Sequence, residues 1–174
     1  MISKSKKIIG KNIYLRPLTI HDATEEYCSW LNDTEVNKYL ETKGSTMSEL
    51  REYVDSQINN PNSFFVGIFD VANDSHIGNI KLEPIDWDKR KAVCGIMIGK
   101  KNYRGRGIGT EATDLITKYS FDNLGLEVIE LGVLTNNIGG VKAYTRAGFI
   151  ETQRDIKRRT DGSMEEEILM IKRK

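Results

Sequence analysis

Three glycines at alternate positions mark the stretch of this chain that is best suited to bind an anion. They are Gly105, Gly107 and Gly109, within Tyr-Arg-Gly-Arg-Gly-Ile-Gly-Thr at 103–110. The stretch follows an apolar run typical of a strand and opens an amphipathic segment typical of a helix. The first turn of a helix has N–H groups without helical acceptors and a partial positive charge, and glycines leave those groups uncovered. With Arg104 and Arg106 adding positive charge, the pattern predicts a phosphate site at a helix N-terminus.

Two widespread phosphate-binding patterns do not fit this stretch. The sequence Gly-x-x-x-x-Gly-Lys-Ser/Thr is absent, and the spacing Gly-x-Gly-x-Gly differs from the dinucleotide pattern Gly-x-Gly-x-x-Gly. From these residues alone, the stretch could still be a turn without a ligand or part of an unrelated phosphate-binding α/β domain.

A second polar pattern follows the next apolar run, at 128–134. Asn136 and Asn137 precede a short helical segment, Tyr144 lies seven residues after Asn137, and Gly148-Phe149 comes next. An Asn at this place could cap the helix or hydrogen-bond a ligand, and both roles are compatible. Gly139 and Gly140 weaken the start of the helix, which leaves two explanations open: a frayed first turn, or a need for small residues beside a ligand.

Together the two patterns resemble, in order and spacing, the acetyl-CoA motifs of the GNAT superfamily of N-acyltransferases. The matching positions are Arg104, Gly107, Gly109, Asn137, Tyr144 and Gly148-Phe149. The resemblance covers nearly the whole chain, and the segments 13–18 and 30–36 are similar to the Rim-type branch, which acetylates ribosomal proteins and related targets. It implies an acetyl-CoA-dependent N-acetyltransferase in which the acceptor amine attacks the thioester directly in a ternary complex.

The resemblance also implies where acetyl-CoA binds. Amides of the glycine-rich turn would hold the pyrophosphate, and the strand at 96–98 would pair with pantetheine where it splays from the next strand. An amide of Met97 or Ile98 would stabilise the oxyanion, and Gly99 would permit a bend after the strand. The expected cofactor-binding residues are Ile96, Met97, Ile98, Arg104, Gly105, Arg106, Gly107, Ile108, Gly109, Thr110, Asn137 and Tyr144.

Acyl transfer from a thioester to an amine needs an acid and a base. Tyr144 is the candidate acid for the leaving thiolate, on the strength of its family spacing from Asn137. An alkyl ammonium must lose a proton before it attacks. Glu83, at the end of an apolar run, is the candidate base, with Glu41, Asp86 and Asp88 as other carboxylates and ordered water as a further route.

The acceptor is expected to be a small amine, such as an amino sugar, a polyamine or an antibiotic. The alternatives are a protein N-terminus, as in ribosomal-protein acetyltransferases, and a non-catalytic acyl-CoA-binding module. A homodimer is common among such folds, but nothing in the residues requires one.

Two further groups have more than one interpretation. Cys94 could carry an acyl group, although a small core residue is favoured. The cluster Lys157-Arg158-Arg159 could contact a phosphorylated acceptor or the 3′-phosphate of the cofactor, although an exposed charge cluster is favoured. His21 and His76 match no acid–nucleophile set, and no Cys/His cluster has metal spacing, so no metal is expected.

Composition places few demands on function. The chain has 174 residues, 39% hydrophobic and 29% charged, with a net charge of +1, which predicts one domain spanning 1–174 with no preference for nucleic acid or membrane. No apolar run approaches the ~18–20 residues that span a bilayer, and residues 1–9 do not read as a signal peptide. Two cysteines without tight spacing indicate a reducing, cytoplasmic location.

The elements that position these residues alternate along the chain. The apolar periodicity predicts strands at 12–18, 64–69, 77–82, 92–98, 128–134, 149–158 and 164–171, and helices at 20–32, 108–124 and 138–147, with a capping box at 46–49 starting one more helix that Pro61 ends. This order predicts an α/β (α+β) fold: a mixed, mostly antiparallel sheet of six to seven strands with helices on both faces.

Overall fold

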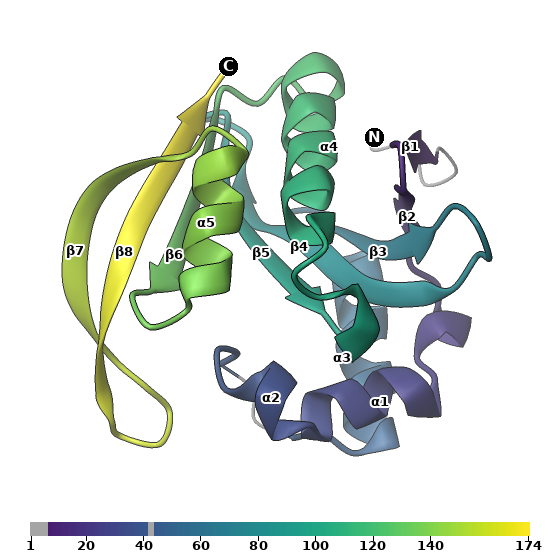
Figure 1. The fold of residues 1–174 in the computed structure, drawn as a ribbon. Coiled ribbons are helices and arrows are strands. Elements are labelled where there is room, and N and C mark those ends of the chain that lie inside the picture. The colour runs from purple at the N-terminus through teal and green to yellow at the C-terminus, as the bar shows by residue number, and fades with distance from the viewer. Residues whose placement is uncertain (1–6, 42–43) are drawn as a thin grey trace.

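An eight-stranded sheet organises the computed structural model, which describes residues 7–41 and 44–174 (Figure 1). Its strand order is β1-β2-β3-β4-β5-β6-β8-β7, with β5 and β6 parallel and the other neighbours antiparallel. The strands are β1 Ile8–Ile9, β2 Ile13–Pro17, β3 Phe64–Asp70, β4 His76–Asp86, β5 Lys91–Ile98, β6 Val128–Leu134, β7 Ile150–Arg158 and β8 Met164–Arg173. All seven expected strands are present, and the two-residue β1 is added at one edge. The expectation about a signal peptide falls mainly on residues 1–6, which lie outside the described residues.

Helices cover both faces of the sheet, as expected. They are α1 Glu25–Asn32, α2 Thr34–Asn37, α3 Met47–Asn59, α4 Ile108–Asn123 and α5 Ile138–Arg146, with 3₁₀ turns η1 Ile20–Asp22 and η2 Lys101–Tyr103. One buried cluster joins α4 and α5 to the sheet and includes Ile116 and Tyr144. The other joins α1, α2 and α3 to the opposite face and includes Tyr27 and Leu50. None of the helices in the described ranges has the length and apolar character required to cross a membrane.

The helix expected over 20–32 is divided into η1 and α1. The Asp22 carboxylate accepts from the Thr19 N–H at 2.7 Å, which caps the start of η1. Thr24 then caps the start of α1 by accepting from the Tyr27 N–H at 3.2 Å. Each polar side chain satisfies N–H groups at the start of its own element, so two caps close together produce a break. The apolar pattern predicted a helix over this range. The break was not predicted, because the apolar pattern continues through it. The four-residue α2, capped by Asp33, was also not expected.

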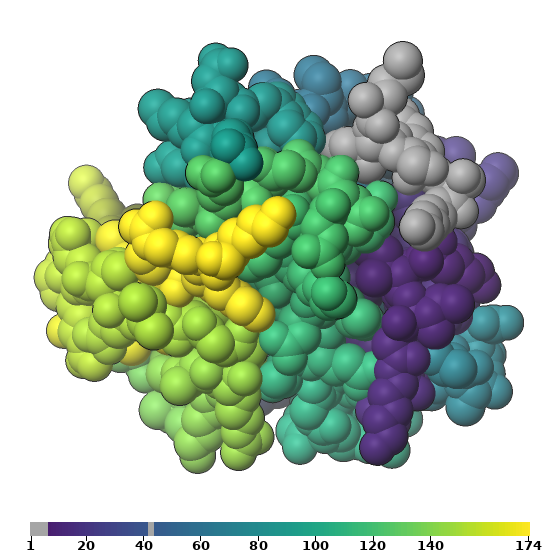
Figure 2. Space-filling model, turned by 90° about the horizontal axis from the view of Figure 1, so that it is seen from above, coloured from purple at the N-terminus to yellow at the C-terminus, as the bar shows by residue number. Residues whose placement is uncertain are grey.

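The start of α4 is fixed from the N-terminal strands. The Glu111 carboxylate accepts from the backbone N–H groups of Lys11 (2.7 Å) and Asn12 (2.8 Å). On the other side of the helix, Lys172 of β8 pairs with Asp114 at 3.3 Å. Viewed from above, α4 accordingly lies between the N-terminal segment and the C-terminal end of β8 (Figure 2). The glycine-rich turn therefore enters a helix whose position is set by two distant parts of the chain.

The parallel strands β5 and β6 separate along their length. They pair only from Lys91↔Val128 to Val93↔Glu130, after which β5 stays with β4 and β6 stays with β8. Beyond Val93 the edges of β5 and β6 that face each other make no ladder, so the sheet opens at this point. This is the splay that the family resemblance led us to expect between these two strands.

Candidate active site

A cleft of about 1110 Å³ begins where β5 and β6 separate. One end, here called the cofactor half, is lined by the start of α4, by α5 and by β5. The other end, here called the acceptor half, lies toward α1 and α3 and is lined by Tyr27, Leu31, Glu35, Tyr39, Leu40, Glu41, Tyr53, Phe65, Asn79, Lys81, Lys157, Arg159 and Glu167. The cleft thus crosses the sheet from one helical layer to the other.

The glycine-rich turn has the backbone conformation that an anion site needs. Gly105 and Gly107 have φ of +71° and +81°, a region that side-chain-bearing residues rarely adopt, and Gly107 is the N-cap of α4. The first helical bond of α4 runs from the Glu111 N–H to the Gly107 carbonyl at 3.0 Å. The N–H groups of residues 108–110 therefore have no acceptor within the helix, and these residues line the cleft.

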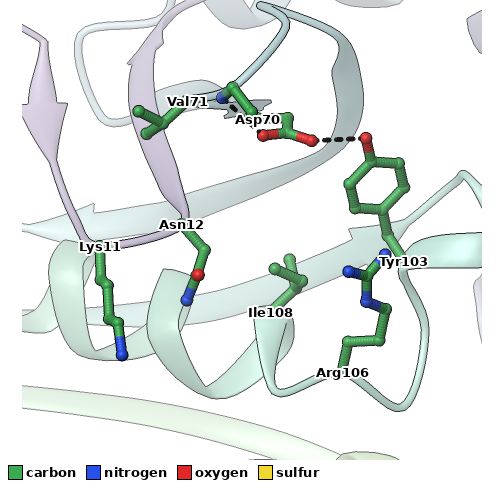
Figure 3. Close-up of a pocket in the computed structure, with 8 residues that line it drawn as sticks. Lys11, Asn12, Asp70, Val71, Tyr103, Arg106 and Ile108 are labelled. Atoms are coloured by element: carbon green, nitrogen blue, oxygen red, sulfur yellow. Dashed lines mark hydrogen bonds between the residues drawn. The ribbon is translucent and has the colours of Figure 1, made fainter.

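The two arginines of the turn diverge. Arg104 lines the cleft and donates to the Ile98 carbonyl (3.1 Å) and the Gly99 carbonyl (2.7 Å), which ties the turn to the end of β5. Arg106 instead lies in a separate pocket of about 350 Å³, with its guanidinium 5.6 Å from the centre of the Tyr103 ring (Figure 3). Tyr103 is held by its hydroxyl, which donates to Asp70 at 2.6 Å. The Arg106 side chain is therefore not among those that line the cleft, and its contact with the cofactor stays a prediction.

The second of the paired glycines, Gly140, packs closely against Asn137 at the start of α5. Asn137 caps the helix, its Oδ1 accepting from the Gly140 N–H at 3.0 Å. A Cβ at Gly140 would lie 2.7 Å from Asn137 Nδ2, so a larger residue there would require the capping side chain to shift. Tyr144 lies one turn further on, lines the cleft and is 7% exposed. Burial raises the pKa of its phenol above the ordinary value, so the hydroxyl keeps its proton.

Side chains at the end of β5 point alternately toward the two helical layers. Ile96 and Ile98 pack toward α4 and α5, whereas Met97 packs toward α1 and α3, and all three line the cleft. Gly99, expected to permit a bend, has a different role, because a Cβ there would overlap the Trp30 ring. Glycine is required so that α1 can pack against the end of this strand.

The structure does not bring Glu83 to the cleft. Its carboxylate accepts from Lys81 Nζ at 2.6 Å and from Gln57 Nε2 at 3.0 Å, and Glu83 is not among the cleft residues. Partial burial would raise the pKa of Glu83, but the hydrogen bonds from Lys81, Gln57 and Asn60 outweigh it and lower the pKa. Its role as base stays a prediction that these surroundings do not favour. Of the other candidate carboxylates only Glu41 lines the cleft, and its hydrogen bond with Lys157 lowers its pKa.

Cys94 also lines the cleft, beneath the splayed strands. Burial raises the pKa of its thiol to about 12, so at neutral pH it holds almost no thiolate. A thiol in that state is a poor nucleophile, which favours direct attack by the amine over an acyl-cysteine. Within the described ranges, no group of three His, Cys, Asp or Glu side chains could hold a metal ion.

Sequence reasoning named Glu41 as a candidate base but not Tyr39 and Leu40 beside it, and it misjudged the β7–β8 hairpin. The Arg159 side chain is only 3% exposed, where an exposed charge cluster was favoured. It donates to the Leu40 carbonyl at 2.7 Å and pairs with Glu165 at 3.3 Å, while Lys157 pairs with Glu41 at 2.7 Å. The basic run at 157–159 was the only signal in the sequence, and it could not show which distant segment the hairpin binds.

Comparisons with known proteins are consistent with this geometry. A protein-family model described as Acetyltransferase (GNAT) domain matches residues 12–150. The probable N-acetyltransferase YjcK of Bacillus subtilis (strain 168) is 30% identical over 150 residues, which cover 80% of this chain and 81% of that protein.

Two solved structures have closely similar folds. Spermidine N-acetyltransferase from Vibrio cholerae, in complex with CoA and spermine, superposes with a TM-score of 0.85 at 22% identity, covering 94% of this chain and 96% of that one. A proposed ribosomal-protein-serine acetyltransferase from Vibrio cholerae gives a TM-score of 0.79 at 19% identity, covering 99% and 100%. At such identities the likeness shows the fold alone.

Proposed function

Because the chain belongs to the acetyltransferase (GNAT) family, we propose that it transfers the acetyl group of acetyl-CoA to the primary amine of a small molecule of the amino-sugar type. Family membership makes the chain an N-acetyltransferase, so the alternatives of a non-catalytic module and of an unrelated phosphate-binding domain are set aside. The expected fold class is confirmed by the same family match and by the solved structures.

The cofactor half fits acetyl-CoA, the acetyl donor that this family uses. We assign the pyrophosphate to the free amides at 108–110, since positive-φ glycines keep side chains away from them. Asn137, Tyr144 and the end of β5 line the continuation of the cleft toward the acceptor half. When bound, acetyl-CoA supplies an activated thioester carbonyl.

Residues of the cleft would stabilise the oxyanion and the departing sulfur. An amide of Met97 or Ile98 is assigned to the oxyanion, and the Tyr144 hydroxyl to the departing sulfur. We assign removal of the ammonium proton to water in the cleft, because Glu83 lies outside it and Glu41 has a lowered pKa.

Contacts that cross the acceptor half favour a small acceptor. The segment 39–41 lines the cleft and contacts two separate elements: Leu40 accepts from Arg159 of the hairpin (2.7 Å), and the Tyr39 hydroxyl donates to the Asn136 carbonyl (3.4 Å). A protein N-terminus must enter with a polypeptide attached. Because the segment 39–41 connects the hairpin to the loop at Asn136 across the cleft, we favour a free small molecule as acceptor.

The charges of the acceptor half disfavour a polyamine. A polycation needs carboxylates that are free to pair with it. Each carboxylate that lines this half already has a cation of the chain: Glu41 and Glu167 pair with Lys157 at 2.7 and 3.1 Å, and Glu35 pairs with Lys38 at 3.1 Å. A hydroxylated amine with a single positive charge is therefore the better match.

Thermal unfolding followed by an amine panel tests the proposal. Acetyl-CoA and CoA at ~100 times their dissociation constants should stabilise the fold by about 2.7 kcal/mol, whereas ATP and NAD should not. Thiol release is then measured with amino sugars, polyamines, aminoglycosides and peptides. Turnover confined to peptides would contradict the small-molecule acceptor, and preferred turnover of spermidine would contradict the charge argument.

Glu83→Gln should have little effect on turnover. The Glu83 carboxylate is paired with Lys81 and lies outside the cleft, so we expect kcat to fall far less than the ~10²-fold or more that loss of a general base causes. The measurement is kcat against pH for the variant and the wild type. Glu41→Gln, which alters a carboxylate of the cleft, serves as the comparison. A loss of ~10²-fold with an unchanged KM would restore Glu83 as the base.

The remaining sequence expectations stay predictions. Both cysteines are free thiols, consistent with the expected cytoplasmic location. A homodimer and the absence of metal also remain to be measured.

A further inference from the structure

Asn79 places an unsatisfied hydrogen-bond donor in the acceptor half. The residue lies on β4, is 4% exposed and lines the cleft. Its Nδ2 has no hydrogen-bond partner among the residues that the structure describes, and it is the one such buried side-chain atom among them. Buried polar groups are nearly always paired, so an unpaired donor on a residue that lines a cleft calls for a partner, which the cleft can supply.

His76 fixes the orientation of the Asn79 amide. His76 Nε2 lies 3.0 Å from the Gly78 carbonyl, which can only accept, so Nε2 carries the proton. The same Nε2 lies 2.8 Å from Asn79 Oδ1, which accepts as well. Exchanging the amide oxygen and nitrogen would set two donors against each other. Nδ2 therefore points away from His76.

The support beneath this amide is rigid. His76 is enclosed by aromatic rings, with centroids 4.8 Å from Phe69, 5.1 Å from Trp30 and 5.7 Å from Tyr27. Burial lowers the pKa of His76, which favours the neutral ring with a single N–H, and the Gly78 carbonyl places that N–H on Nε2. The direction of the Asn79 donor is thus set by packing and does not depend on a mobile side chain.

Chemistry limits what this donor can bind. The amine that attacks must aim its lone pair at the thioester carbon, so its nitrogen cannot also accept from Asn79. The partner is then an oxygen of the acceptor. Asn79 is paired with Met97 across the β4–β5 ladder, so it lies on the far side of β5 from the opening toward β6. That position is closer to the acceptor half than to the opening through which the thioester enters.

We propose that Asn79 Nδ2 donates to an oxygen carried next to the reacting amine, so that the acceptor is an amino alcohol such as an amino sugar. The inference rests on the proposed function and deepens it by naming the group that the enzyme recognises. Polyamines carry no such oxygen and would leave the donor unpaired.

A matched pair of amines tests this contact. The probes are trans-2-aminocyclohexanol and cyclohexylamine, which differ in one hydroxyl beside the amine, and turnover is read by thiol release. The wild-type enzyme should prefer the amino alcohol in kcat/KM by ~10-fold or more, because a site built for a hydroxyl rejects an analogue without it. Asn79→Leu, similar in volume but without the donor, should bring the ratio of the two probes close to one.

The two amines differ in basicity, but this difference cancels when the ratio of their kcat/KM values is compared between the wild type and a variant. Thr117→Val is the matched control: Thr117 is a fully buried polar residue of α4 that does not line the cleft, so this variant should keep the preference. Stabilisation by CoA, measured on each variant, shows that the fold and the cofactor half are intact.

The outcomes separate the two proposals. If the wild type acetylates no amine of the panel, the proposed function fails. If it acetylates amines but does not prefer the amino alcohol, or if Asn79→Leu slows both probes equally, the proposed contact is wrong. An equal loss would place Asn79 on the thioester oxygen instead.

Discussion

Gly107→Val is expected to abolish the binding of acetyl-CoA. Gly107 has φ of +81° at the N-cap of α4, and valine, with its branched side chain, is among the residues least able to adopt that conformation. The backbone must then turn, which redirects the N–H groups of the first helical turn. In addition, the new side chain would stand in the cleft that Gly107 lines.

The effect should appear as lost ligand stabilisation. CoA at a concentration that raises the unfolding temperature of the wild type should produce no shift for Gly107→Val, and turnover should fall below detection. Unchanged CoA affinity would contradict the assignment of the pyrophosphate to this turn.

Gly125→Val controls for the strain itself. Gly125 follows the other end of α4 with φ of +71°, and, as at Gly107, a Cβ there would meet no atom within 4 Å. The two substitutions impose similar backbone strain on the same helix, but Gly125 does not line the cleft. We expect Gly125→Val to lower the unfolding temperature and to keep the shift with CoA. If both variants lose the shift, the loss reports damage to α4 rather than to the anion site.

The comparison of these glycines shows what the sequence could and could not predict. Alternating Gly105, Gly107 and Gly109 indicated a bare turn, and two of the three have positive φ. Gly99 and Gly140 looked like a hinge and a weak helix start. The structure instead places Gly99 against Trp30, which is far away in the sequence, and Gly140 against Asn137, which caps the same helical turn. Backbone conformation is a local property that spacing can indicate, whereas a steric contact depends on which element arrives at that point.

The same distinction applies to the site. The cofactor half is formed largely by two continuous segments, 96–110 and 137–144, so local patterns could predict residues that line one cleft, while their contact with acetyl-CoA stays a prediction. The acceptor half is assembled from many elements, and its polar groups act through long-range contacts such as Arg159 with the Leu40 carbonyl or Lys157 with Glu41. Glu83 was attractive in sequence because it ends an apolar run, but nothing in that run indicates that β4 continues to Asp86 and turns the carboxylate toward α3.

Tyr144→Phe is expected to lower kcat by ~10²-fold and to leave CoA affinity near that of the wild type. The phenylalanine ring fills the same space, so the packing of Tyr144 against Phe149 is retained and only the hydroxyl is lost. That hydroxyl has no hydrogen-bond partner within the described residues, and it is part of a side chain that lines the cleft. A donor left free in this way is available to a sulfur that becomes negative as the thioester breaks.

The raised pKa of Tyr144 defines how it helps. An ordinary tyrosine has a pKa of about 10 and a thiol about 8.5. Burial moves the phenol further above the thiol, so complete proton transfer to the thiolate is unfavourable. We therefore expect Tyr144 to stabilise the thiolate mainly by a hydrogen bond that strengthens as charge develops. Because a raised pKa keeps the phenol protonated until the pH exceeds that value, kcat should show no alkaline fall from Tyr144 below pH ~10.

Tyr119→Phe gives the matched control, and the pH profile separates the remaining possibilities. Tyr119 is a buried tyrosine of α4 that stacks on Phe64 and does not line the cleft, so its variant should keep full turnover. Equal activity of Tyr144→Phe and the wild type would remove Tyr144 from the mechanism. A large loss in Tyr144→Phe combined with an alkaline limb near the ordinary pKa of tyrosine in the wild type would keep Tyr144 as the acid. It would also mean that bound acetyl-CoA relieves the effect of burial, so that full proton transfer replaces the hydrogen bond.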